Sequence, residues 1–230
     1  MKASRDCLLE REQEVMRLLR LFLNQKLDFI VVGGYAISTY KKRFSIDLDL
    51  VLQEKDLEKF ENWLIKEGYV LHYEKKIGLL YGESFKRFIK KIRNLPVNVD
   101  FLINGLVSRA TDSVWSLDYI KRHSLKRKLN NLEFLTPKRE LLIAMKFHSG
   151  RLSDVRDVVA LMPCNKEELK KHLLKGDIKK LKKAMKKQLA FLEKPQFDDS
   201  FKGIFGIHVY NEKDVKIAKE MIRDLLKEIS

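Results

Sequence analysis

Residues 46–52 read IDLDLVL, and this stretch decides the fold class. Apolar and acidic residues alternate at its start, which is the period of a β-strand with one buried face. Asp47 and Asp49 therefore project from the same face, with Cβ atoms roughly 7 Å apart. Apolar residues flank them, although aspartate is a poor strand former. Taken alone, the pair is as consistent with the solvated face of an edge strand as with a functional site.

Two glycines lie upstream, between a predicted strand and a predicted helix. Residues 27–32 form a short, apolar, β-branched run that ends at Gly33-Gly34, and residues 35–40 suit a short helix. Unhindered backbone N–H groups at the start of such a helix can approach a phosphate closely. A tight turn is the alternative reading of the two glycines, and the aspartates downstream favour the phosphate-binding one.

The remaining pattern predicts an α+β protein with a mixed sheet and a helical C-terminal region. A helix is expected over residues 5–26 and another over 56–66, closed by Gly68. Strand-like segments follow at residues 69–73, 78–81, 85–92 and 97–103. Later helices are expected at residues 139–148, 155–161, 166–174, 178–192 and 214–229.

A soft domain boundary is placed before residue 136. Residues 1–135 would form the α/β core with its N-terminal helix, and residues 136–230 the helical region. Thr136, Pro137 and Glu140 resemble an N-cap, a first-turn proline and a capping-box partner for the helix that follows.

Composition limits the compartment and the partners. The 230 residues include 47 Lys and Arg against 32 Asp and Glu, a net charge of +15 that favours a polyanionic partner or substrate. A charged, thermophile-like surface is the alternative. Two cysteines without CxxC spacing indicate neither a disulfide framework nor a zinc site. Charges interrupt every apolar run near the N-terminus, so we expect a cytoplasmic protein that does not enter membranes.

Paired carboxylates at the end of a strand are a natural seat for a metal-bound nucleoside triphosphate. Hard cations such as Mg²⁺, or Mn²⁺, take oxygen ligands and keep substrate phosphates in the remaining positions. Two-metal phosphoryl transfer normally requires a third carboxylate. Asp100 is the candidate, because it is the one acid in the strand-like run 96–103.

Basic residues further along could contact the triphosphate. Lys146, at the end of a predicted helix, and Arg151 soon after it would supply a positive clamp, although Lys146 could equally be an ordinary surface lysine. Asp154 and Asp157 are expected to orient that cluster by salt bridges. The five histidines show no metal-ligand spacing, and His148 is expected to have a structural or surface role. Residues 166–187 hold ten lysines and three acids, and could follow an RNA backbone or form a solvated face.

The order of these motifs resembles the DNA polymerase beta-like nucleotidyltransferase superfamily, in which Gly-Gly or Gly-Ser precedes Asp-x-Asp and a third acid lies on a later strand. Residues 33–37 (GGYAI) and 43–50 (RFSIDLDL) look like its AbiEii branch. Residues 136–146 and 151–157 are similar to a second block of that branch. The resemblance covers about residues 27–161, and Arg139 and Ser153 depart from it.

The resemblance implies a nucleotidyltransferase that moves NMP from an NTP such as ATP, GTP or CTP to a hydroxyl group. Members of that branch include toxins of toxin–antitoxin systems, some of which modify tRNA ends, so RNA is the implied acceptor and an antitoxin a partner. Rivals are transfer to a protein or small molecule, and a non-catalytic RNA- or protein-binding module. The implied metal ligands are Asp47, Asp49 and Asp100. The implied nucleotide contacts are Gly33, Gly34, Arg43, Ser45, Lys146 and Arg151.

Overall fold

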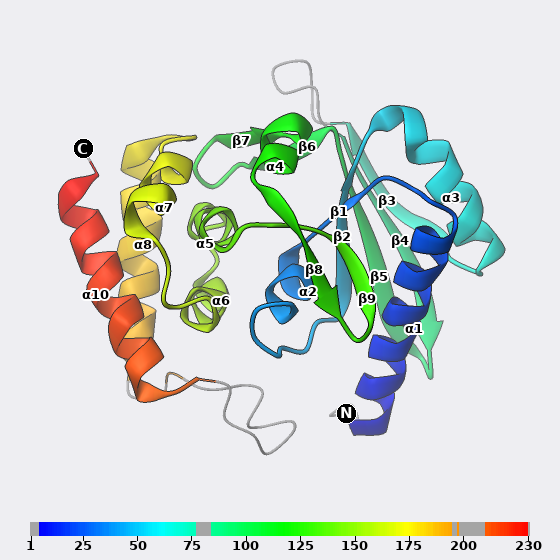
Figure 1. Cartoon of the computed structure of the whole chain (residues 1–230), viewed down its shortest axis with the longest axis horizontal. Coiled ribbons are helices and arrows are strands. Elements are labelled where there is room, and N and C mark those ends of the chain that lie inside the picture. The colour runs from blue at the N-terminus through cyan, green and yellow to red at the C-terminus, as the bar shows by residue number, and fades with distance from the viewer. Residues whose placement is uncertain (1–4, 77–83, 195–196, 198–209, 230) are drawn as a thin grey trace. The chain divides into compact units, whose positions relative to one another are not determined.

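The computed structural model describes residues 5–76, 84–194, 197 and 210–229 (Figure 1). The chain divides into two compact units, and the division is not a single cut. The core unit contains Met1–Thr39, Phe44–Leu106 and Ser116–Pro137. The helical unit contains Tyr40–Arg43, Val107–Trp115 and Lys138–Ser230. The strand expected at residues 78–81 lies outside the described residues.

The core unit is built on a seven-stranded sheet, and the sheet is mixed, as the sequence predicts. Its strand order is β3-β4-β5-β2-β1-β9-β8. The pairs β2–β5 and β1–β9 are parallel, and the other neighbours are antiparallel. The strands are β1 (Ile30–Val32), β2 (Asp47–Leu52), β3 (Val70–Lys76), β4 (Ser84–Ile92), β5 (Leu95–Ile103), β8 (Ser124–Leu129) and β9 (Leu132–Pro137).

Two helices, α1 (Arg5–Asn24) and α3 (Leu57–Lys66), cover one face of this sheet (Figure 1). Phe22 of α1 packs edge-on against Phe60 of α3, with ring centroids 5.1 Å apart. Phe60 packs in turn against Phe101 of β5, at 5.6 Å. All three rings are fully buried, and burial of apolar surface on this scale dominates the stability of a domain. The aromatic side chains therefore fix which face of β5 points into the core.

Alternation along β5 leaves the opposite face to polar groups. Val97, Val99 and Phe101 are buried toward the helices, so Asn98 and Asp100 project from the other face. In β2, the buried Leu48 and Leu50 lie beside Val99 and Phe101, so Asp47 and Asp49 share the face of Asp100. The described residues of this unit also form two short α-helices, α2 (Gly33–Ser38) and α4 (Leu117–Arg122), and a 3-10 turn at Glu54–Asp56.

The helical unit matches the predicted helices closely. It contains α5 (Arg139–His148), α6 (Val155–Ala160), α7 (Lys166–Leu173), α8 (Ile178–Leu192) and α10 (Glu212–Glu228). The chain passes between the units along β6 (Gly105–Ser108) and β7 (Ser113–Ser116), which pair with each other. Among the described residues, no helix is both long enough and apolar enough to cross a bilayer.

One sequence-based expectation is wrong at the start of α5. Thr136 and Pro137 are the last residues of β9, and Lys138 is the N-cap of α5, without a side-chain hydrogen bond. Glu140 Oε1 accepts a hydrogen bond from the backbone N of Asn165 instead of closing a capping box. Thr136 is fully buried in the strand, and this packing overrides the local capping preference.

Candidate active site

The three predicted carboxylates lie on adjacent strands of the core unit. β2 and β5 run parallel with Asp49 beside Asp100 and Asp47 beside Asn98. Side chains of paired residues project from the same face, so Asp47, Asp49 and Asp100 form one acidic cluster. Asp100 is 4% exposed, while Asp47 and Asp49 are partly exposed at the start of β2. The cluster is thus closed at Asp100 and open to solvent at β2.

Gly33 leaves room for the Asp49 carboxylate. It begins α2 directly after β1, and its φ of +64° is one that L side chains rarely adopt. A Cβ atom at this position would lie 1.9 Å from Asp49 Oδ2 and 2.8 Å from Asp49 Cγ. The first glycine of the pair is therefore required by both its backbone conformation and the carboxylate beside it.

Arg87 of β4 is the counter-ion of Asp100, and sequence reasoning missed it. The two residues are directly opposite in the antiparallel β4–β5 pair. Arg87 Nε donates to Asp100 Oδ1 at 2.7 Å and Nη2 to Oδ2 at 2.6 Å, a bidentate geometry typical of strong charge-assisted pairs. The hydrogen bonds to Asp100, together with attraction to Asp47 and Asp49, raise the pKa of the Arg87 guanidinium.

For Asp100 the raised pKa favours the neutral form, whereas for Arg87 it favours the charged form. Loss of water around Asp100 raises its pKa above the ordinary value, although the hydrogen bonds from Arg87 act to lower it. A carboxylate whose charged form is disfavoured in this way is better suited to accept a proton than an exposed aspartate.

Asn98 is a second site residue that sequence reasoning missed. Its Nδ2 donates to Asp47 Oδ1 at 2.7 Å, which fixes the rotamer of the first carboxylate. The signal was present, because residues 98 and 100 fall on the same face of a strand. Locating Arg87 also required the register of the β4–β5 hairpin, whose two-residue turn is Arg93-Asn94, with φ of 47° and 66°.

The donor set of this cluster fits a hard divalent cation. Every ligating atom offered by Asp47, Asp49 and Asp100 is a carboxylate oxygen, the donor that Mg²⁺ and Mn²⁺ prefer. Arg87 supplies a positive charge to this cluster through its pair with Asp100. Because Gly33 has no side chain, it does not cover the Asp49 carboxylate that lies beside it.

Two other predicted contacts in the core unit have structural hydrogen bonds. Ser45 Oγ donates to the main-chain O of Asp47 at 3.3 Å, and the main-chain O of Ser45 accepts from Tyr35 Oη at 3.0 Å. Gly34 is buried in the first turn of α2, and its carbonyl accepts from Ser38 Oγ. Ser45 thus ties the segment before β2 to α2, and Gly34 takes part in a hydrogen bond within α2.

The remaining predicted contacts belong to the helical unit and form a charge network there. Asp157 is 1% exposed and lies 2.7 Å from Arg43 Nε and 2.8 Å from Lys146 Nζ. These are charge–charge contacts rather than well-directed hydrogen bonds, as far as the described residues show. Asp154 pairs with Lys146 at 3.3 Å and with Arg151 at 2.9 Å. As predicted, the two aspartates orient the basic residues by salt bridges.

The basic residues of this network differ in how accessible they are to a ligand. Burial acts to raise the pKa of Asp154, but Lys146 and Arg151 lower it below its ordinary value. Lys146 is buried between two carboxylates, so any phosphate would compete with them for its ammonium group. The Arg151 side chain is 69% exposed and can reach a ligand more readily.

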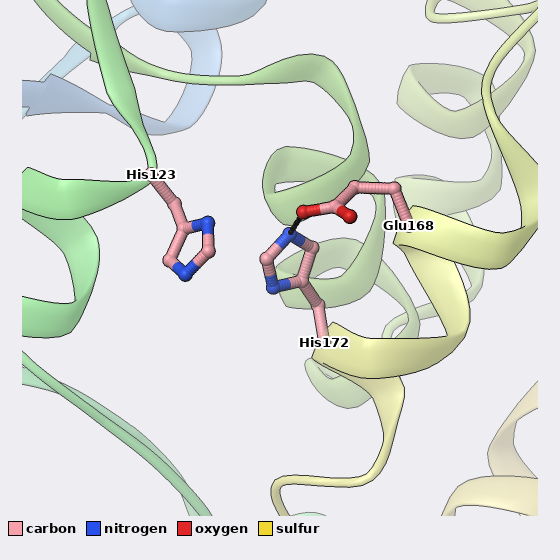
Figure 2. Close-up of side chains that lie close together, drawn as sticks. All are labelled: His123, Glu168 and His172. Atoms are coloured by element: carbon pink, nitrogen blue, oxygen red, sulfur yellow. Dashed lines mark ion pairs between the residues drawn. The ribbon is translucent and has the colours of Figure 1, made fainter.

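Among the described residues of the helical unit, histidines occupy two buried positions. His172 is one helical turn from Glu168, with Nε2 3.6 Å from Oε1 (Figure 2). His123, also labelled in Figure 2, belongs to the core unit. His148 is fully buried, hydrogen-bonded to Thr111 and Leu173 and packed edge-on against Trp115. Its surroundings agree with the expected structural role.

The sequence matches no protein-family model and no curated protein. Similar solved structures include a protein from H. pylori described as a candidate nucleotidyltransferase, with TM-score 0.52 and 15% identity over 96% of each chain. JHP933 from Helicobacter pylori has TM-score 0.51 and 16% identity over 96% of this chain and 93% of its own. The lincosamide antibiotic adenylyltransferase LnuA, bound to lincomycin, has TM-score 0.48 and 16% identity over 65% of this chain and 95% of its own. The mixed sheet with flanking helices and a helical C-terminal region is therefore a nucleotidyltransferase fold.

Proposed function

We propose that the protein is a metal-dependent nucleotidyltransferase that moves NMP from an NTP to a hydroxyl acceptor and releases pyrophosphate. The observation that supports this most directly is the register of β2 and β5, which places Asp49 beside Asp100 with Asp47 two residues away on the same face. The fold agrees with it, because nucleotidyltransferase chemistry is known on this fold and the cluster supplies the acids that the chemistry requires.

In this reaction the acceptor oxygen attacks the α-phosphorus as the bond between that phosphorus and the bridging oxygen of pyrophosphate breaks. Asp47 and Asp49 would hold two Mg²⁺ or Mn²⁺ ions, and Asp100 would help to hold one of them. Bound there, such ions activate the attacking hydroxyl and neutralise charge on the leaving pyrophosphate. Asp100 can take the proton of the hydroxyl, a role that its raised pKa favours. The hydrogen bond from Asn98 would hold Asp47 in place for this role.

Binding of the triphosphate is assigned to the glycine pair and the basic residues. The backbone N–H groups of Gly33 and Gly34 would approach the phosphates, with Ser45 nearby. Arg43, Lys146 and Arg151 would supply positive charge, with the exposed Arg151 the most accessible of the three. Each assignment predicts a rise in KM for NTP when the residue is changed.

RNA, and tRNA in particular, is the acceptor that we propose, on the basis of the resemblance to the AbiEii branch and the net charge of +15. The same resemblance suggests a toxin with a cognate antitoxin. Transfer to a protein or a small molecule keeps the same acidic cluster and changes the acceptor. A non-catalytic module would keep the fold without using the cluster.

The deciding experiment incubates the protein with Mg²⁺, each α-labelled NTP in turn and total RNA, then separates RNA from protein. Asp47→Asn and Asp49→Asn should abolish labelling while the protein remains folded. Asp118→Asn, which makes the same charge change at an exposed position of α4, should leave labelling intact. Thermal melts of all variants check folding.

Each result bears on a named alternative. Label on an RNA band that is lost in the β2 variants supports the proposal and identifies the nucleotide. Label on protein, with or without RNA present, would favour transfer to a protein instead of RNA. Variants that lose labelling but keep RNA binding separate catalysis from binding. Absence of label with every NTP and acceptor, and unchanged biological effect in the variants, would favour the non-catalytic module.

A further inference from the structure

The outer face of α8 carries a row of lysines. Lys179, Lys183, Lys186 and Lys187 are all exposed and recur at intervals of three and four residues, so they share one face of the helix. Within the described part of the chain, no acidic side chain forms an ion pair with any of the four. At a rise of 1.5 Å per residue the row extends over about 12 Å.

The neighbouring helix has a similar sequence and a different charge balance. In α7, Lys166 and Lys170 pair with Glu228 of α10, at 2.6 and 2.9 Å, and Lys171 pairs with Glu168 at 2.9 Å. The pKa values of these three lysines are raised by those hydrogen bonds. Of the lysine-rich stretch 166–187, the α7 part is thus neutralised within the protein, and the α8 row is not.

The row is held on a rigid element. The opposite face of α8 is buried in the helical unit through Leu181, Met185 and Leu192. Gln188 on that face donates hydrogen bonds to the carbonyls of Lys146 and Arg151, at 3.1 and 3.0 Å. Like charges four residues apart destabilise a helix, so the row lowers stability unless an anion lies against it.

The chemistry of the face selects the class of anion. A membrane-surface helix needs apolar side chains to insert, and the apolar side of α8 is already buried. The exposed positions of α8 offer lysines and Ala190, without large apolar or hydrogen-bond-accepting groups for a folded protein partner. A linear series of ammonium groups suits a linear series of phosphates, whose counter-ions are released on binding.

We propose that the row formed by Lys179, Lys183, Lys186 and Lys187 binds the phosphodiester backbone of the RNA acceptor. The choice of RNA over another phosphodiester rests on the function proposed above. The contact is to phosphates, so it positions the acceptor and does not read its sequence.

The test compares two triple variants with the same charge change. K179Q/K183Q/K187Q removes three charges from the α8 row, and K166Q/K170Q/K171Q removes three from the neutralised lysines of α7. Both are made in an Asp49→Asn background, so that binding is measured without nucleotidyl transfer. Fluorescence anisotropy follows labelled tRNA, DNA of the same sequence and vesicles of anionic lipid, with thermal melts as the folding control.

The α8 variant should bind tRNA at least about tenfold more weakly at low salt, and the α7 variant within about twofold of the parent. The association constant for tRNA should be measured between about 50 and about 200 mM KCl. The plot of its logarithm against log[salt] should become less steep, by about 2 to 3, for the α8 variant alone, as expected for three lost phosphate contacts. Equal losses in both variants, or none, would overturn the proposal. Equal binding of DNA would retain the phosphate contact and overturn the choice of RNA, whereas α8-dependent binding to vesicles alone would replace it with a membrane surface.

This test separates RNA binding by the α8 row from the nucleotidyl transfer proposed above. A protein that labels RNA but is unaffected by the α8 changes keeps its transferase function and loses this surface. A protein that labels nothing but binds RNA through α8 loses the transferase proposal and keeps the surface.

Discussion

The backbone of Gly33 lies against the carboxylate of Asp49 so closely that an added Cβ atom would be 1.9 Å from Oδ2. No rotation of the added methyl group relieves this contact, because a Cβ position is fixed by the backbone. Either Asp49 or the start of α2 must move. The relationship links the glycine pair to the acidic cluster by contact, not only by order along the chain.

Gly33→Ala should therefore severely impair the nucleotidyl transfer proposed above. Displacement of Asp49 by about 1 Å is expected to lower kcat at least about 100-fold. Gly68→Ala is the matched control, since Gly68 also has a positive φ, of +81°, but nothing lies within 4 Å of an added Cβ. It should lose only about 1 kcal/mol of stability from backbone strain and keep its activity. Similar activity losses in both variants would show that strain, and not the contact with Asp49, is responsible.

Arg87→Met should destabilise the protein in a pH-dependent way. Asp100 would be left buried without its counter-ion, at a cost of about 2 kcal/mol near pH 7, because Arg87 is itself about one-third exposed. Without Arg87 the pKa of Asp100 rises further, so the cost should be small at pH 4, grow as the pH rises from the wild-type pKa toward that of the variant, and then level off. Urea unfolding at several pH values measures the difference from wild type.

The double variant Arg87→Met/Asp100→Asn supplies the control. It removes the buried charge and should recover most of the stability at pH 7. Mg²⁺ or Mn²⁺ should raise the melting temperature of Arg87→Met more than that of the double variant, because a cation can then neutralise Asp100. A pH-independent loss in Arg87→Met would mean that packing, and not the charge of Asp100, explains it.

Protonation of His148 should lower the stability of the protein in acid. Its Nε2 contacts the carbonyl of Leu173, which accepts hydrogen bonds only, so Nε2 carries the proton and Nδ1 accepts from Thr111. Burial lowers the pKa of His148 to about 4, below its ordinary value in the unfolded chain. Stability is therefore complete above about pH 6.5 and should fall between about pH 6.5 and about pH 4, by about 3 kcal/mol at most.

His148→Gln can retain a donor and an acceptor without titrating. Its unfolding free energy should decline less than that of wild type over the same pH interval. The comparison removes the contribution of the acidic groups that both proteins share. Parallel declines would exclude His148 as the source.

Asp157→Ala should destabilise the protein through the charge network of the helical unit. It leaves Arg43 and the buried Lys146 without their shared carboxylate, at a cost of about 3 kcal/mol. Glu193→Ala removes a partner of Arg223 from an exposed pair and should cost less than about 0.5 kcal/mol. Chemical denaturation of the two variants tests the contrast, and equal effects would contradict it.

Strong periodicity made parts of the fold predictable. The alternation in residues 46–52 gave β2, and helical spacing gave α5 and α8 with the bounds that the structure has. The shared orientation of Asp47 and Asp49 followed from the same alternation. In these segments the burial of one face and the secondary-structure propensity of the residues favour the same structure.

Cross-strand relationships were not predictable from such patterns. The hairpin of β8 and β9 was missed, because charged residues make β8 half-exposed and its turn, Asn130-Asn131, lacks a glycine. Arg87 and Asn98 were missed for a related reason. Periodicity assigns each to a face of its own strand, but only the pairing of β4, β5 and β2 decides which carboxylate each contacts.

The interrupted division of the chain has a consequence for how this protein can be cut or recombined. Arg43, Thr111 and Trp115 come from segments far upstream of α5, yet they surround Asp157 and His148 inside the helical unit. A fragment beginning at Lys138 would lack all three. The C-terminal helices are therefore not a cassette that gene fusion can transfer, and a fusion that respects the architecture must carry residues 40–43 and 107–115 with them.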